Sequence, residues 1–166
     1  MLSIFRYLVF KFRYSRSAGF TLIEILVVLA VVGIVAGIGV SSLSNVNTTS
    51  ALTVEAEKVL SLLAKARSFT LAAKDGVAYG VHIESGKAVL FKGVSYSAGA
   101  SSNQVQALHS EVTISTFSLA GGGSEVKFQK LTGSTAEVGT ITLRAVRNAQ
   151  QTKVITVNAT GIASSN

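Results

Sequence analysis

The sequence contains no cysteine, no proline and no tryptophan, and its 166 residues include only two histidines, His82 and His109, and one aspartate, Asp75. Without cysteine the chain has no disulfide, no thiol nucleophile and no cysteine-based metal site. A site built from several histidine and aspartate side chains has very few such residues available. We therefore expect no catalytic residue, no metal ion and no cofactor.

The positions of the histidines support that expectation. His82 lies in a strand-like segment whose neighbours face the other way, which predicts a solvent-facing side chain. His109 is adjacent to Ser110 and Glu111, and neighbours along an extended chain point in different directions, so they cannot form a catalytic triad. Gly121–Gly123 is not followed by Gly-Lys-Ser/Thr, which favours a flexible loop over a phosphate loop. The sequence therefore predicts a protein that is not an enzyme.

Acidic residues are scarce: 8 Asp and Glu stand against 15 Lys and Arg, a formal net charge of +7. Residues 1–19 hold four of the cations and no acid, and without this leader the net charge falls to +3. The basic character of the chain is therefore weak evidence for nucleic-acid binding. Cations before an apolar segment favour retention of that end in the cytoplasm, which would place the rest of the chain outside.

Residues 20–40 form a long apolar run in which 14 of 21 residues are Phe, Leu, Ile or Val and Glu24 is the single charge. Fourteen such side chains contribute about −4 to −8 kcal/mol to membrane insertion, and an acid near the end of the run costs less than one at its centre. The run is long enough to cross a bilayer as one helix. The spacing of Gly33 and Gly37 suits close helix packing, although glycine is also simply common in membrane helices.

The segment Gly19-Phe20-Thr21-Leu22-Ile23-Glu24, after a basic leader and before an apolar run, resembles type IV prepilins and type II secretion pseudopilins. The resemblance implies that a prepilin peptidase cuts between Gly19 and Phe20 and that the new amino group of Phe20 is methylated. It assigns filament assembly to Glu24. The implied partners are the peptidase, other pilin or pseudopilin subunits, the inner-membrane assembly platform and the lipid bilayer.

A physical argument supports the role of Glu24 independently. A carboxylate in an apolar environment requires a cationic partner, and the amine formed at Phe20 of a neighbouring subunit would supply one. Such a pair would fix the axial register between two helices. The alternative is an ordinary membrane anchor with Glu24 at the interface, but an anchor does not require this motif.

The chain after residue 40 changes character twice. Residues 41–50 contain eight Ser, Asn or Thr, which predicts a weak or interrupted joint. Residues 51–75 predict an amphipathic helix that ends near Gly76, with Glu55, Lys58 and Lys65 off its apolar stripe. The stripe comprises Leu52, Ala56, Val59, Leu63 and Ala66.

From residue 76 to 166 the apolar period is two, which predicts a mainly antiparallel β domain and an α+β fold. Ser85-Gly86 suits the turn of a first hairpin. Further strands are expected at 104–108, 112–119, 125–129, 140–146 and 153–158. This order of elements resembles the GspH/FimT-type minor pseudopilins. The residues that carry the resemblance are Ala66-Arg67 near the end of the helix, Val126-Lys127-Phe128, Gly133, Gly139–Leu143 and Ile155–Ile162.

The sequence thus predicts a structural subunit, anchored by one helix in the cytoplasmic membrane with its globular domain outside, and built into a pilus or secretion pseudopilus. The alternative is a minor pilin that binds DNA or another surface ligand. Arg144, Arg147 and Lys153 are the candidate DNA contacts, since phosphate binding needs several cations on one face. A solvated turn explains these three residues more simply.

Overall fold

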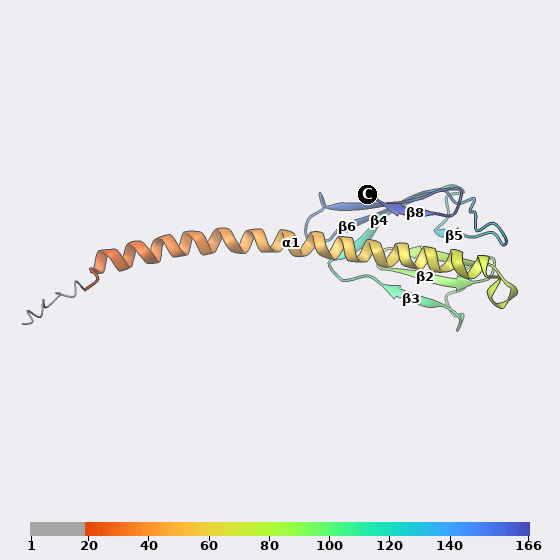
Figure 1. Cartoon of the computed structure of the whole chain (residues 1–166), viewed down its shortest axis with the longest axis horizontal. Helices are drawn as coiled ribbons and strands as arrows, with labels where there is room; N and C mark the ends of the chain where they lie inside the picture. The colour runs from red at the N-terminus through yellow and green to blue at the C-terminus, as the bar shows by residue number, and fades with distance from the viewer. Residues whose placement is uncertain (1–18) are drawn as a thin grey trace, which may run out of the picture. The chain divides into compact units, whose positions relative to one another are not determined.

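The computed structural model describes residues 19–166, apart from the side chains at positions 38–47. All of the predicted leader except Gly19 lies outside this range. The described part contains one long helix, one short 3-10 helix and eight strands (Figure 1). Their bounds are α1 Leu22–Leu71, η1 Lys74–Gly76, β1 Tyr79–Glu84, β2 Lys87–Lys92, β3 Gln104–Ala107, β4 Val112–Leu119, β5 Glu125–Lys127, β6 Gly139–Ala145, β7 Thr152–Val157 and β8 Ala163–Ser165.

Helix α1 is assigned without a break across residues 41–50, where the sequence favoured a weak or interrupted joint. The interruption is therefore absent, because Ser, Asn and Thr each cost only a fraction of a kcal/mol in a helix and no proline or glycine lies in that stretch. Whether the joint is weak stays a prediction. Contacts divide the chain into two units, residues 1–41 and 42–166. Among helical residues with described side chains, no stretch has both the length and the hydropathy of a membrane span.

The helix ends at Leu71, four residues before the predicted end at 75. The reason is that Ala73 and Asp75 adopt left-handed backbone angles, with φ of 48° and 54°, ahead of Gly76 at 68°. Thr70 connects this end of the helix to β1. Its buried hydroxyl accepts a hydrogen bond from the Tyr79 backbone N–H at 2.9 Å and donates one to the Ala66 carbonyl oxygen at 2.9 Å.

Eight strands form two antiparallel sheets of four, ordered β3-β2-β1-β5 and β4-β6-β7-β8. The predicted hairpin around Ser85-Gly86 is confirmed, with Glu84 paired to Lys87. Strand β4 has the predicted ends, and the other strands expected between residues 104 and 158 are present with ends shifted by one or two residues. Strand β8 is an additional edge strand. Figure 1 shows the second half of α1 running beside both sheets. The predicted α+β class is therefore confirmed.

The apolar stripe of α1 is buried between the sheets, since all five of its predicted members are at most 2% exposed. The sheets contribute alternate residues, among them Val81, Ile83, Ile141 and Leu143. Glu55 was expected off this stripe, but it is 3% exposed and therefore lies on the buried face of the helix. Its Oε1 lies 2.7 Å from the Lys58 ammonium, which compensates part of the cost of burying that charge.

Candidate functional site

The predicted processing site lies just before the first turn of α1. Gly19 and Phe20 both precede the helix, and the Phe20 side chain is 79% exposed. A side chain at Gly19 would meet no atom within 4 Å. The bond between these residues therefore lies outside the helix, and both residues that flank it are exposed.

Thr21 and Glu24 form a capping box at the start of α1. The Glu24 backbone N–H donates to Thr21 Oγ1 at 3.2 Å, and the Thr21 N–H donates to Glu24 Oε2 at 3.5 Å. The two side chains thus satisfy two of the free N–H groups at the helix start. From the sequence, Glu24 was interpreted only as an intermolecular residue and its capping role was missed, although Thr-x-x-Glu before an apolar run is the signature of a capping box.

The capping box also directs the Glu24 carboxylate toward the end of the helix at which Phe20 lies. A carboxylate there is stabilised by the positive end of the helix dipole. Cleavage between Gly19 and Phe20 would create a cationic amine one residue before Thr21. The geometry therefore suits an acid that meets an N-terminal amine.

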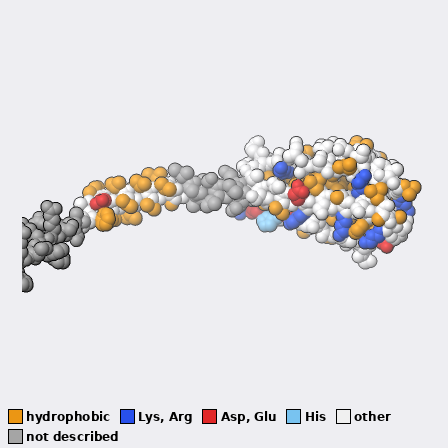
Figure 2. All heavy atoms as spheres, viewed as in Figure 1, with side chains coloured by type: hydrophobic (Ala, Val, Ile, Leu, Met, Phe, Trp, Pro, Cys, Tyr) orange, Lys and Arg blue, Asp and Glu red, His pale blue; other side chains and the backbone are white. Residues whose placement is uncertain are grey.

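The first turns of α1 expose apolar side chains on every face. Figure 2 shows hydrophobic atoms gathered along this segment. The large side chains from Leu22 to Val35 are 45–79% exposed. Ideal Cβ positions at Gly33 and Gly37 meet no atom within 4 Å, so both glycines leave room for close approach of another helix. An apolar surface of this kind needs lipid or a partner to cover it.

The three cations proposed for DNA contact do not share one face of their sheet. Leu143 is buried, so Arg144 next to it points away from the core, whereas Lys153 is paired with Leu143 and lies on the core side. Arg147 forms an ion pair with Glu111, with 2.7 Å between Nε and Oε2. The structure therefore separates Arg144 from Lys153 and gives Arg147 an acidic partner.

The histidines lie in different settings. His109 Nδ1 accepts the Glu111 backbone N–H at 3.2 Å, in the turn before β4. The side chain of His82 is only 16% exposed, so the expectation of a solvent-facing residue was wrong. It is covered by Tyr96, whose ring stacks on it with 3.9 Å between centroids. In the part of the chain that the structure describes, no group of three His, Asp or Glu side chains is arranged to hold a metal ion.

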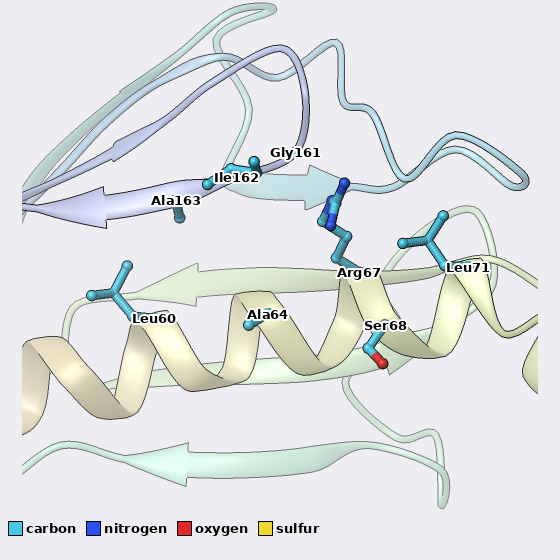
Figure 3. A pocket seen from close by; sticks show the side chains of 8 residues that line it. All are labelled: Leu60, Ala64, Arg67, Ser68, Leu71, Gly161, Ile162 and Ala163. Atoms are coloured by element: carbon cyan, nitrogen blue, oxygen red, sulfur yellow. The ribbon is translucent and has the colours of Figure 1, made fainter.

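A groove runs between α1 and the start of β8 (Figure 3). It has a volume of about 310 Å³ and is lined mainly by apolar side chains, among them Leu60, Leu71 and Ile162. Arg67 lies at one end, and its Nε donates to the carbonyl oxygens of Gly133 and Thr160 at 3.1 and 3.2 Å. Arg67 therefore joins the helix to two loops of the β domain, and we assign it a structural role.

Asp75 organises the connection between α1 and β1. Its Oδ2 accepts the Tyr79 hydroxyl at 2.8 Å and lies 3.0 Å from the Lys92 ammonium. The Tyr79 hydrogen bond, with the Lys92 contact, lowers the pKa of Asp75 below its ordinary value of 3.8. Burial and the neighbouring Asp75 raise the pKa of Tyr79. This hydrogen bond and ion pair thus join the end of the helix to strands β1 and β2, and the cluster has a structural role.

Comparison with known proteins agrees with the N-terminal geometry and the fold. Residues 14–40 match the family model of the prokaryotic N-terminal methylation motif. The structure is similar to the crystal structure of the type IV minor pilin FimU of Pseudomonas aeruginosa strain PAO1, with a TM-score of 0.52 and 16% identity, over 69% of this chain and 92% of that chain. No curated protein matches the sequence. The chain therefore combines a prepilin methylation motif with a pilin-like fold.

Proposed function

We propose that this prepilin-like chain is a structural subunit, a minor pilin or pseudopilin, of a type IV pilus or a type II secretion pseudopilus. The observation that carries the proposal is the methylation motif over residues 14–40, placed on an uncovered helix start with a capped Glu24. The pilin-like β domain supports it. In this role the chain catalyses no reaction and is itself the substrate of a prepilin peptidase.

Processing would proceed between Gly19 and Phe20, and the new amino group of Phe20 would be methylated. The apolar first part of α1 would remain in the cytoplasmic membrane as a single span until assembly, with the β domain outside. Filament formation would then bury the same apolar side chains against other subunits. The apolar surface of α1 would thus be covered first by lipid and then by partner helices. Gly33 and Gly37 would permit the closest approach, and the assembly platform would drive the transfer.

Glu24 would act in this transfer through its charge. Inside an apolar bundle an unpaired carboxylate is costly, and pairing with a cationic N-terminal amine removes that cost in one axial register only. Thr21 would hold the carboxylate toward the amine. The proposal therefore predicts that charge at position 24 affects assembly far more than it affects membrane insertion.

Mass spectrometry of the mature N-terminus tests the processing step. We expect a chain that begins at N-methylphenylalanine 20 in cells that possess the peptidase. A mature protein that retains residues 1–19 would refute the proposal, as would cleavage after the apolar run.

Incorporation of variants into purified filaments tests the assembly step. We expect Glu24→Gln to insert in the membrane normally but to be depleted from filaments. Glu57→Gln is the matched control, because Glu57 is also an exposed acid on α1 and lies in the second unit of the chain. Equal incorporation of the two variants would remove the role of Glu24.

A further inference from the structure

A second buried cluster lies on the face of the sheet β3-β2-β1-β5 that points away from the main core. Val89 and Phe91 on β2 are at most 1% exposed, yet they are not part of the main core cluster. His82 on β1 stands between Val89 and Glu125 in the cross-strand register. The residues that cover this face come from the segment 93–103 between β2 and β3, through Tyr96.

Tyr96 is held at three points. Its ring stacks on His82 with an interplanar angle of 12° and meets the edge of the Phe91 ring at a centroid distance of 5.9 Å. Its backbone N–H donates to Glu125 Oε1 at 3.3 Å. Two of these three contacts involve His82 or the carboxylate beside it. The position of the 93–103 segment therefore depends on the state of this His–Glu group.

Both ring nitrogens of His82 face carboxylates. Nε2 lies 3.6 Å from Glu84 Oε1, and Nδ1 lies 3.8 Å from Glu125 Oε1 and 3.4 Å from Ser124 Oγ. A neutral imidazole has one N–H, so one of its nitrogens then presents a lone pair to a carboxylate. An imidazolium has a donor on each side. The arrangement of acceptors thus suits the protonated ring.

The other described groups around His82 are one lysine and three uncharged side chains. The Lys87 ammonium lies 3.2 Å from Glu84 Oε2 and so shares that carboxylate with His82. Val89 and Phe91, from β2, are apolar, and the Tyr96 ring presents its face, which attracts a cation. Two carboxylates and one aromatic face therefore surround the His82 ring, which is 16% exposed.

We propose that His82 is a proton-operated clasp, which on protonation tightens the 93–103 segment over the outer face of the sheet β3-β2-β1-β5. The imidazolium fixes Glu125 in place as the acceptor of the Tyr96 N–H and attracts the Tyr96 ring above it. The proposal does not depend on filament assembly. In an exported domain, however, it would couple the surface of the protein to the pH outside the cytoplasm.

Amide hydrogen exchange of the full chain in detergent micelles tests the clasp, compared at about pH 5 and about pH 7.5, on either side of the ordinary histidine range. Rates are corrected for intrinsic exchange. We expect the amides of residues 94–98 to exchange about three- to tenfold more slowly at the lower pH, the range given by partly exposed charge pairs and a cation–π contact. The His82→Gln variant should lose this pH dependence, because its side chain does not titrate.

His109→Gln is the matched control, since it removes a histidine from a turn without a ring stack and should leave the pH response unchanged. Tyr96→Leu keeps His82 titratable but removes the ring that transmits its charge, so the response should also disappear. Far-UV circular dichroism confirms that each variant is folded. An unchanged response in His82→Gln or Tyr96→Leu, or no response in the natural chain, would overturn the proposal.

Discussion

Arg67 and Gly133 are 66 residues apart in the sequence and are joined by a hydrogen bond of 3.1 Å from the Arg67 Nε to the Gly133 carbonyl oxygen. The same Nε lies 3.2 Å from the Thr160 carbonyl oxygen. Gly161 follows Thr160, and a Cβ at Gly161 would lie 1.9 Å from the Gly133 carbonyl oxygen. Three of the residues that suggested a resemblance to GspH/FimT-type proteins, Arg67, Gly133 and Gly161, therefore meet at one junction between α1 and the β domain.

Removal of the Arg67 side chain should loosen this junction. We expect Arg67→Ala to lower the free energy of unfolding by about 1–2 kcal/mol, because two carbonyl groups lose a charged donor. Urea-induced unfolding of the full chain in detergent measures the change. Lys65→Ala is the control on the same helix, and its effect should stay within about 0.5 kcal/mol. Equal effects of the two substitutions would contradict the assigned role of Arg67.

A methyl group at Gly161 should be far more disruptive than one at a glycine whose Cβ position has open space around it. Gly161 has φ of +75°, and its Cβ would overlap the backbone of Gly133, so we expect Gly161→Ala to cost more than about 2 kcal/mol. Gly86→Ala is the matched control, since no atom lies within 4 Å of its Cβ position. Thermal unfolding compares the two variants, and similar midpoints would show that the junction tolerates a side chain.

Loss of the capping hydroxyl should fray the start of α1. We expect Thr21→Ala to destabilise the first turn by about 1 kcal/mol, while Thr21→Ser should retain most of the cap. Amide exchange of residues 23–25 in micelles reports the opening of that turn. If Thr21→Ala and Thr21→Ser exchange alike, the hydroxyl does not cap the helix.

Acid should destabilise the β domain through Glu137. Burial raises the pKa of Glu137, but hydrogen bonds from Thr135 and the Lys127 backbone, with the Lys127 ammonium, outweigh it and bring the pKa below 4.5. A lowered carboxyl pKa in the folded state contributes stability above the unfolded value, and this contribution is lost as the pH falls through the folded value.

The Glu137→Gln variant tests the direction of this pH dependence of stability. We expect it to be less stable than the natural chain near neutral pH, with the difference shrinking as the pH falls below 4.5. Unfolding midpoints measured along a pH series give the comparison, and Glu57→Gln is the exposed control. A difference that grows toward acid would mean that Glu137 is held in its protonated form.

Local patterns predicted the elements of the fold. The apolar period of 51–75 placed five core residues correctly, since helical spacing alone decides which side chains share a face. The Ser85-Gly86 turn fixed the first hairpin for a similar local reason. The short β8 was not predicted, because three residues carry too little periodicity and the strand exists through its pairing with β7.

Candidate sites were predicted less evenly. The methylation motif could be recognised because cleavage residue, acid and apolar run lie within one continuous segment, and the role of Glu24 in assembly stays a prediction. Arg144 and Lys153 lie on opposite faces of their sheet, which their closeness in sequence did not reveal, and their contact with DNA stays a prediction. His82 was also misjudged, since its cover comes from a segment beyond the next strand.

The sequence by itself determined the N-terminal motif, the long helix and the α+β class, all of which depend on residues near one another in the chain. Only the tertiary structure decided how Arg67 meets Gly133, why Gly161 must lack a side chain, and which groups surround His82. Among these contacts, His82 and Tyr96 are 14 residues apart in the sequence, and Arg67 and Gly161 are 94 apart. Local propensity says nothing about such pairs, because their energy is gained only after the two sheets and the helix have packed.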